Sequence, residues 1–335
     1  MNRRFVCAME KLLFGGGEKG SSENPSSPCE KLSVPEGSSV LALEDIQFGE
    51  EIGRGAFGTV KRGLFKGKDV AVKSLIVRDL VSNSLVKYFY SELEVLQSLD
   101  HPHLLRYYGC VQRGNTVHIV TEFMRGGSLS QLITPPSVPP LPWNLIVHLA
   151  VCVAEGLAHL HSRDLLHRDI KTENLLLDDN WRIVIADYGF SKKVVDLRGG
   201  VRQPGTILGT EAFMAPEVQF GEAYGEGADV FSLGCVLAEM LCGREVGKNG
   251  FLERTPRNKF AADLDVLRGA ALPDSPPSLI ECTCQCLAYE PENRLSAELV
   301  YDWLTDLKGE LPPLDLSSLP NPSALRKGGG GGNSN

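Results

Sequence analysis

Three glycines near the start of the chain have the spacing of a phosphate-binding loop: Gly53, Gly55 and Gly58, with Arg54, Ala56 and Phe57 between them. Glycine has no Cβ atom, so backbone N–H groups there can approach phosphate oxygens closely. The same spacing occurs in dinucleotide-binding turns, which open a helix. Here Thr59-Val60 leads instead into a second β-like run that ends at Lys73. The glycines are therefore predicted at a hairpin tip, with Lys73 one strand downstream.

The elements that would position these residues differ between the two halves of the chain. Short β-rich runs, such as Lys68 to Val72 and Val117 to Glu122, alternate with glycine-containing turns in the first half. From Leu145 onward apolar residues repeat at helical spacing, interrupted by a hairpin-like segment around Asp178 to Asn180. The sequence predicts an α+β fold with a small β-rich lobe, a large helical lobe and a ligand cleft between them.

Polar segments flank this region on both sides. Gly15 to Ser39 is rich in Gly, Ser, Pro and Glu, and the C-terminal end carries five consecutive glycines. Such compositions bury too little apolar surface to fold. We expect a disordered N-terminal arm over residues 1–40, one folded domain over residues 41–311 and a flexible tail over residues 312–335. The two lobes would span residues 41–122 and 125–311.

Charge and composition exclude several classes of function. The net charge of −8 gives no electrostatic footprint for nucleic acid. No uncharged apolar run of about 20 residues exists, so no membrane span is expected. The nine cysteines show no secreted-disulfide spacing, which favours a cytoplasmic protein. Cys282, Cys284 and Cys286 alternate, but without a second Cys/His cluster buried thiols are favoured over a metal site.

From Phe48 to about Trp303 the sequence resembles a eukaryotic protein kinase domain of the serine/threonine type, most like the tyrosine-kinase-like group. The resemblance adds four motifs to the glycine-rich hairpin: Val70-Ala-Val-Lys73, His167-Arg-Asp-Ile-Lys-Thr-Glu-Asn174, Asp187-Tyr-Gly189 and Met214-Ala-Pro-Glu217. It implies transfer of the ATP γ-phosphate to serine or threonine hydroxyls of protein substrates, with Mg²⁺, under an unknown upstream activator.

The resemblance assigns the chemistry of the second motif to three side chains. Asp169 would orient the substrate hydroxyl and accept its proton, and Lys171 would neutralise charge on the γ-phosphate. Asn174 would bind Mg²⁺. The close spacing matters because carboxylate and amide must reach one small volume from a single tight loop.

The remaining phosphate and metal contacts would come from elsewhere in the chain. Lys73 would hold the α- and β-phosphates, fixed by an ion pair with Glu92, and Asp187 would bind Mg²⁺. Tyr188 stands where the family usually has Phe, so its buried hydroxyl would need a hydrogen-bond partner.

An adenine site is implied around residues 119–124. The Glu122 carbonyl and the Met124 amide would hydrogen-bond adenine, and Thr121 would be a small residue at the back of the pocket. The other nucleotide contacts would be apolar residues and the hairpin tip: Ile52, Val60, Ala71 and Leu176, with Gly53, Arg54, Gly55, Ala56, Phe57 and Gly58.

Further residues match structural positions of the family. Glu217 would form an interior ion pair with Arg294, and Asp229 would brace the catalytic loop through backbone N–H groups. Phe231 replaces the usual Trp. Arg168 needs an anion near the active site, and Thr206 is the best candidate for a phosphate that supplies it.

Serine/threonine selectivity is favoured by Lys171 and by the segment from Gly209 to Glu217, in which Thr210 would narrow the substrate site. Glu173 predicts a shallow preference for basic substrates, because the companion acid near residue 128 is replaced by Ser128. A dual-specificity or tyrosine kinase is the alternative. A pseudokinase scaffold is disfavoured, because it would lack one of Lys73, Asp169 and Asp187.

Overall fold

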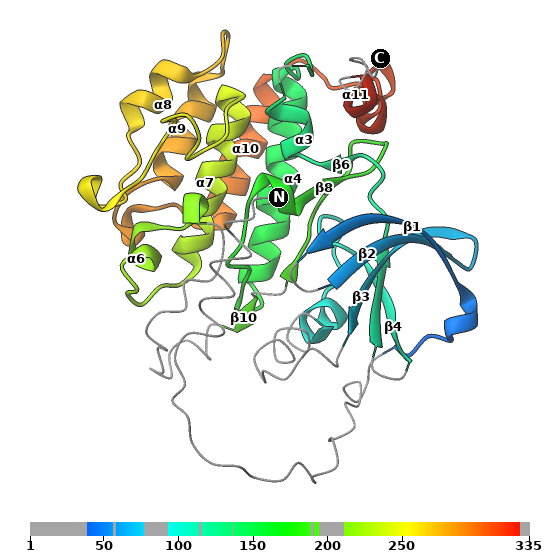
Figure 1. Ribbon diagram of the computed structural model, residues 1–335. Coiled ribbons are helices and arrows are strands. Elements are labelled where there is room, and N and C mark those ends of the chain that lie inside the picture. Colours follow the sequence, from blue (N-terminus) through cyan, green and yellow to red (C-terminus); the bar gives the residue numbers. More distant parts are fainter. Residues whose placement is uncertain are drawn as a thin grey trace, which may run out of the picture.

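The computed structural model describes residues 39–55, 58–76, 93–113, 116–135, 137–188, 191–193 and 211–328. The chain forms a small lobe dominated by a sheet and a large lobe dominated by helices, so the predicted α+β architecture is confirmed (Figure 1). The polypeptide passes from the first lobe to the second at residues 122–127. We call this segment the hinge.

The N-lobe is built on a five-stranded antiparallel sheet with strand order β1-β2-β3-β5-β4. Helical residues 93–98 belong to the same lobe. The strands are β1 (Ile46–Gly55), β2 (Gly58–Phe65), β3 (Lys68–Ile76), β4 (Tyr107–Arg113) and β5 (Thr116–Glu122).

The register of this sheet separates a core face from a functional face. Val70 and Val72 are fully buried in an apolar cluster with Val120 on one face. Side chains alternate along a strand, so Ala71 and Lys73 of β3 lie on the other face.

Helices dominate the C-lobe, where α4 and α10 pack together and α7 packs against α9. The longer ones are α4 (Trp143–His161), α7 (Glu226–Cys242), α9 (Pro277–Cys286) and α10 (Ala297–Glu310); the shorter ones are α3 (Ser130–Ile133), α6 (Pro216–Gln219), α8 (Leu264–Ala270) and α11 (Pro322–Gly328). Two small sheets support the catalytic residues: β6 (Gly127–Ser128), β8 (Leu175–Leu177) and β9 (Ile183–Ile185), and the pair β7 (Leu165–Leu166) with β10 (Lys192–Lys193).

The stripe predicted on α4 forms the centre of the C-lobe core. Its residues Leu145, Leu149, Leu157 and Leu160 are buried, and each such side chain contributes about 2 kcal/mol of apolar burial. Among the described residues, α4 alone is long and apolar enough to cross a membrane, and most of its candidate span is buried inside the protein.

The cysteines of the described residues are free thiols buried in the protein. Cys282, Cys284 and Cys286 lie on α9, and burial raises the pKa of Cys284 and Cys235. Within the described part of the chain, no group of His, Cys, Asp and Glu has a metal-binding arrangement. The predicted burial of the Cys282, Cys284 and Cys286 thiols is confirmed.

Both ends of the described chain pack onto the domain. The Cys110 amide of β4 donates to the Ser39 carbonyl, and the Leu41 amide donates to the Cys110 carbonyl, each at 2.9 Å. Pairing therefore begins at residue 39, before the predicted boundary at 41, and residues 1–38 lie outside the described part.

The C-terminal segment differs from the flexible tail that composition predicts. Residues 312–328 follow the C-lobe surface, form the 3-10 turn η8 (Leu316–Ser318) and end in α11 (Figure 1). The physical reason is a set of leucines that pack against the core: Leu314, Leu316, Leu319 and Leu325. Residues 329–335 lie outside the described part.

Candidate active site

In the loop between β7 and β8, two polar side chains converge on the carboxylate of Asp169. The Lys171 Nζ atom donates to Asp169 Oδ2 at 2.6 Å. The Asn174 Nδ2 atom donates to the same oxygen at 2.9 Å and to the Asp169 carbonyl at 2.8 Å. The 3-10 turn η3 (Thr172–Asn174) makes this possible by bringing Asn174 back over Asp169. The structure therefore brings together the carboxylate, ammonium and amide that the sequence predicts.

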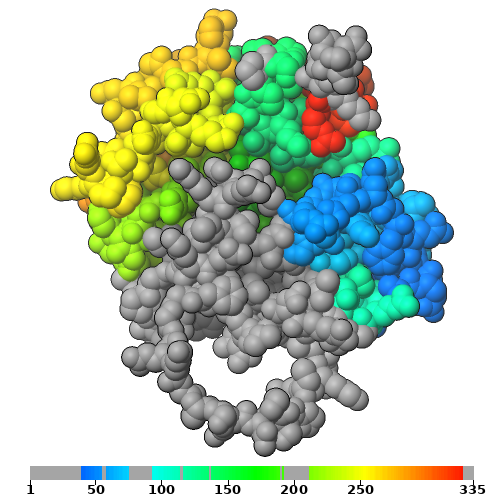
Figure 2. Space-filling model, in the orientation of Figure 1, coloured from blue at the N-terminus to red at the C-terminus, as the bar shows by residue number. Residues whose placement is uncertain are grey.

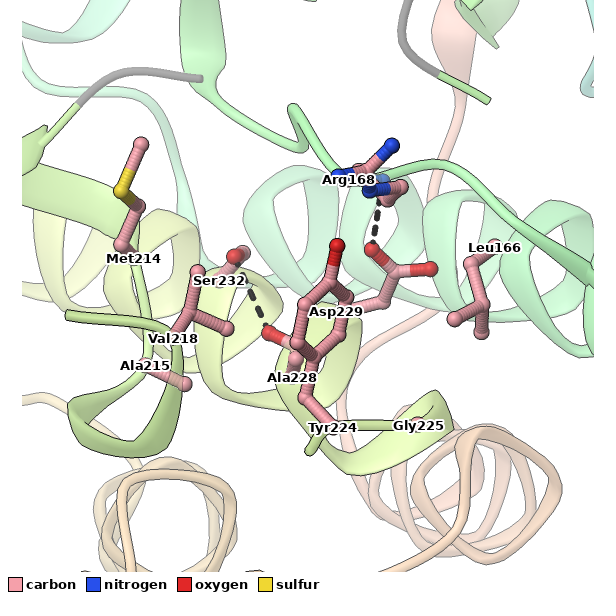
Figure 3. A pocket seen from close by; sticks show the side chains of 10 residues that line it. All are labelled: Leu166, Arg168, Met214, Ala215, Val218, Tyr224, Gly225, Ala228, Asp229 and Ser232. Atoms are coloured by element: carbon pink, nitrogen blue, oxygen red, sulfur yellow. Dashed lines mark hydrogen bonds between the residues drawn. The ribbon is translucent and has the colours of Figure 1, made fainter. Parts of the chain in front are cut away.

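Asp229, at the start of α7, holds this loop from below (Figure 3). Its carboxylate accepts the His167 amide at 2.8 Å, the Arg168 amide at 2.7 Å and His161 Nε2 at 3.1 Å. Burial acts to raise the pKa of Asp229, but these hydrogen bonds outweigh it and hold the pKa below its ordinary value. The predicted bracing role of Asp229 is confirmed.

Arg168 needs this support because its φ of 70° lies in the left-handed region. A non-glycine residue there stores roughly 1–3 kcal/mol of strain, which fixed hydrogen bonds must offset. Its guanidinium lies over the Tyr224 ring, with Cζ 5.5 Å from the ring centre. Both residues line a small pocket behind the loop (Figure 3). Thr206 and Thr210 lie outside the described residues.

His167 connects this loop to the segment that ends in Asp187. Its Nδ1 atom accepts the Asp169 amide at 3.3 Å, so Nε2 carries the proton and donates to the Ala186 carbonyl at 3.1 Å. Burial lowers the pKa of His167, which keeps the ring neutral. His167 therefore links the positions of Asp169 and Asp187.

Asp187 follows β9 and reaches the N-lobe. Its Oδ1 atom lies 3.8 Å from Lys73 Nζ, so the structure brings these two predicted residues together across the lobes. Asp187 adopts a φ of 68°, another strained conformation at the site. Glu92, the predicted partner of Lys73, lies outside the described residues.

Tyr188 satisfies its hydroxyl within the core. The hydroxyl donates to the Ile185 carbonyl at 2.8 Å, and the ring meets His167 edge to face at 5.4 Å between centres. Burial raises the pKa of this phenol, which stays neutral. The same Ile185 carbonyl accepts the Leu105 amide at 3.0 Å. Tyr188 thus fills its buried site with an aromatic ring, and its hydroxyl has the hydrogen-bond partner that we expected for a buried hydroxyl.

The N-lobe register places the predicted nucleotide residues on one face. Val60 pairs with Lys73, and Ala71 pairs with Thr121. Residues directly opposite in an antiparallel pair share a face, so these four side chains lie together. Thr121 is nearly buried, and Leu176 of β8 is half-buried.

The hairpin prediction for the glycine-rich segment is also met. Gly53 pairs with Val60, Arg54 with Thr59 and Gly55 with Gly58, so β1 and β2 pair antiparallel up to these two glycines. Arg54 pairs with Glu51 on the exposed surface, with Nε 3.0 Å from Oε1. Ile52 is also exposed. Ala56 and Phe57 lie outside the described residues.

The hinge is held by an arginine that the sequence motifs do not reveal. Arg182, after the β8–β9 turn, forms an ion pair with Glu122 and donates to the Pro102 carbonyl at 2.9 Å. Its Nη2 atom also lies 3.5 Å from the Met124 sulfur. Arg182 therefore fixes the residues predicted to hydrogen-bond adenine.

A buried ion pair stabilises the lower lobe as predicted. Arg294 contacts Glu217 with two hydrogen bonds, at 2.6 and 2.8 Å. It also donates to the Gly227 carbonyl at 2.9 Å, and its guanidinium lies 4.9 Å from the centre of the Phe231 ring. Phe231 thus provides the aromatic face at this position.

A family model for the protein kinase domain matches residues 46–303, which is most of the described fold. The chain belongs to the protein kinase family. The protein kinase domain accounts for the two lobes and for the order in which the site residues follow one another.

Several curated kinases are similar to this kinase chain. A RasGEF domain-containing serine/threonine-protein kinase X of Dictyostelium discoideum is 36% identical over 254 residues, covering 76% of this chain and 26% of the relative. A probable serine/threonine-protein kinase of the same organism is 34% identical, covering 84% and 42%. Dual specificity testis-specific protein kinase 1 of Rattus norvegicus is 33% identical, covering 84% and 45%. The kinase chain spans a quarter to a half of the length of these relatives.

Proposed function

We propose that this protein transfers the γ-phosphate of ATP to serine or threonine hydroxyls of protein substrates. The convergence of Lys171 and Asn174 on the Asp169 carboxylate carries the proposal, because it places a base, a cation and an amide in one small volume. The similarity to serine/threonine kinases supports the same activity.

Asp169 accepts the proton of the substrate hydroxyl, and Lys171 holds the carboxylate toward the attacking oxygen. The contact at 2.6 Å keeps Lys171 Nζ beside Asp169 Oδ2. From there the charge of Lys171 also stabilises the transferred phosphoryl group. Lys73, on the functional face of β3, binds the α- and β-phosphates. Each of these groups acts by position and charge.

The oxygen donors of Asp187 and Asn174 fit Mg²⁺. Both hydrogen bonds of the Asn174 amide to Asp169 use Nδ2, which directs Oδ1 elsewhere, and magnesium prefers amide and carboxylate oxygens. Asp187 and Asn174 would hold the metal, which neutralises phosphate charge when bound.

Adenine binds at the hinge in this proposal. The Glu122 carbonyl and the Met124 amide hydrogen-bond the base, while Val60, Ala71 and Leu176 cover its faces. The support is the shared face set by the strand register, and the clamp of Arg182 on Glu122.

We further propose that the protein is activated by an upstream kinase and that it is cytoplasmic. An upstream kinase would phosphorylate Thr206, so that the phosphate pairs with Arg168. The buried thiols are consistent with a cytoplasmic protein.

The test is a phosphotransfer assay with purified chain, γ-labelled ATP, Mg²⁺ and a generic protein substrate, followed by phosphoamino-acid analysis. Asp169→Asn is the control, because the amide keeps the shape of the loop and removes the base. Phosphoserine or phosphothreonine that depends on Asp169 supports the proposal. Predominant phosphotyrosine would favour the dual-specificity or tyrosine-kinase alternative. Absence of phosphate transfer by the wild-type protein would overturn the proposed kinase activity.

A further inference from the structure

Residues 312–328, which we call the tail strap, lie along the C-lobe and are held there by hydrogen bonds and apolar contacts. The strap begins where the Asn144 side chain donates to the Pro312 carbonyl at 3.3 Å. Asp315 caps the turn η8 by accepting the Ser317 amide at 3.0 Å, and Asn321 caps α11 by accepting the Ala324 amide at 2.9 Å. Together with its partly buried leucines, these bonds give the strap a defined path.

The strap ends against the hinge. Figure 1 shows α11 beside α3 and close to β6, and Figure 2 shows the strap, in red, on the surface next to this region. Arg326 Nη1 donates to Gln131 Oε1 at 3.0 Å, and its Nη2 lies 3.5 Å from the Arg125 carbonyl. The same Gln131 oxygen accepts the Ser128 amide at 3.2 Å. One guanidinium therefore contacts the hinge carbonyl and the side chain that holds β6.

The hinge sequence fits the strap sterically. A Cβ atom at Gly126 would lie 2.8 Å from both Pro322 Cβ and the Leu177 carbonyl oxygen, closer than real Cβ atoms approach. A Cβ atom at Gly127, whose φ is +80°, would overlap the Arg326 guanidinium. The Gly126-Gly127 pair leaves room for the strap to lie directly on the hinge backbone.

The Arg125 side chain is held by carboxylates from both lobes. The Arg125 side chain forms an ion pair with Asp69 of β3 and lies 3.7 Å from Asp179. Ion pairs thus hold the Arg125 side chain, and Arg326 contacts the Arg125 backbone carbonyl.

We infer that the tail strap sets the position of the hinge for nucleotide binding, with Arg326 as a positioning residue that acts through Gln131 and the Arg125 carbonyl. The inference deepens the proposed function, because it rests on the hinge as the adenine site. The strap contacts the segment just after Met124, so its loss loosens the backbone that holds the base and leaves Asp169 and Lys171 in place.

The experiment compares full-length wild type, Arg326→Ala, Gln131→Ala and the double variant, with Arg257→Ala as an exposed control in the turn η6 (Pro256–Asn258). We expect Arg326→Ala to raise the KM for ATP and the Kd for Mg²⁺-ATP about three- to five-fold, as for the loss of one exposed hydrogen bond of ordinary strength, with kcat within about two-fold. The double variant should bind no more weakly than the weaker single variant, because both changes break one chain of contacts.

A second readout is independent of catalysis. Amide hydrogen exchange should become faster at residues 125–128 in Arg326→Ala and stay unchanged in Arg257→Ala. If wild type binds Mg²⁺-ATP but Arg326→Ala matches it in Kd and in exchange, the strap inference is wrong. If wild type itself shows no binding of Mg²⁺-ATP, the proposed function fails, and exchange at residues 125–128 still decides whether the strap positions the hinge.

Discussion

The Thr172 hydroxyl donates to Glu239 Oε2 at 2.6 Å and joins the catalytic loop to the last turn of α7. The other carboxylate oxygen accepts the Val246 amide at 2.8 Å. Burial raises the pKa of Glu239 to about 7, and the nearby charges of Glu173 and Glu245 add to the effect. A buried carboxyl that titrates near neutral pH thus lies directly beneath the loop that carries Asp169.

The raised pKa predicts that stability falls as pH rises. Between the ordinary value of 4.5 and about 7, the folded protein holds a proton on Glu239 that the unfolded chain has lost. The stabilisation is complete below pH 4.5 and is lost as pH rises through about 7, a change of up to about 3 kcal/mol.

Glu239→Gln should flatten this dependence, since an amide stays neutral and can still serve both partners. Urea unfolding at pH 5 and pH 8 measures the effect. The exposed Glu281→Gln on α9 is the control and should keep the wild-type slope. Equal slopes for wild type and Glu239→Gln would contradict the assignment.

Lys73→Met and Asp187→Ala should each abolish most phosphoryl transfer while preserving the fold. Both side chains are partly exposed, so their ion pair at 3.8 Å adds little to stability. Their charges contribute about 3 kcal/mol or more to the transition state, which is about 100-fold in kcat/KM. Steady-state kinetics, with circular dichroism for folding, test this. Wild-type turnover in either variant would disprove the assigned roles.

Arg294→Ala should destabilise the C-lobe by about 3–5 kcal/mol, because it leaves the buried Glu217 carboxylate without a counter-charge. Arg268→Ala is the matched control. Arg268 is exposed and lies 3.5 Å from Asp265, so its removal should cost less than about 1 kcal/mol. Urea denaturation at pH 7 compares the two. A similar loss of unfolding free energy in both variants would show that the buried Arg294–Glu217 pair contributes no more to stability than an exposed ion pair.

Tyr188→Phe should cost only about 0.5–1.5 kcal/mol and leave activity near wild type. The Ile185 carbonyl keeps its hydrogen bond from the Leu105 amide, so removal of the hydroxyl leaves no buried acceptor unpaired. Thermal unfolding and ATP turnover are the measurements. A loss of more than about ten-fold in kcat, beyond what this small cost explains, would indicate a catalytic role for the hydroxyl.

Peptide selectivity should respond to Ser128 of β6, the residue just after the hinge. Glu173 is exposed, so its attraction for a basic substrate residue is worth about 1 kcal/mol or less, roughly five-fold. Ser128→Glu would supply a second carboxylate and should strengthen the preference for arginine, whereas Ser128→Thr should not. A positional peptide library reads both. Strict demand for arginine in the wild type would contradict the single-carboxylate model.

Contacts within one loop were predictable from residue spacing, whereas long-range contacts were predictable only where a family motif named both partners, as for Glu217 and Arg294. Asp169, Lys171 and Asn174 lie within one tight loop, so their spacing alone restricts where their side chains can meet. Glu239 is 67 residues from Thr172, and Arg182 is 60 residues from Glu122, so only the tertiary fold brings these pairs together.

The sequence did indicate that Glu239 is buried, because this single carboxylate lies between Ala238 and Met240 in an apolar helix. Burial of that position implies a partner, but not which one. The tail strap was missed for a different reason. Its proline and serine content suggests disorder, and the leucines that anchor it are too irregularly spaced to show a helical or strand period.

The short pairing of residues 39–41 with β4 covers part of an exposed edge of the sheet. β4 is the last strand in the order β1-β2-β3-β5-β4, so its outer N–H and C=O groups would otherwise be open to another chain. A Cβ atom at Gly109 would overlap both Ser39 and Leu41, so glycine leaves room for that cover. A protein trimmed to start at Ile46 would present a bare strand edge, and its solubility would then depend on concentration because copies could pair through it.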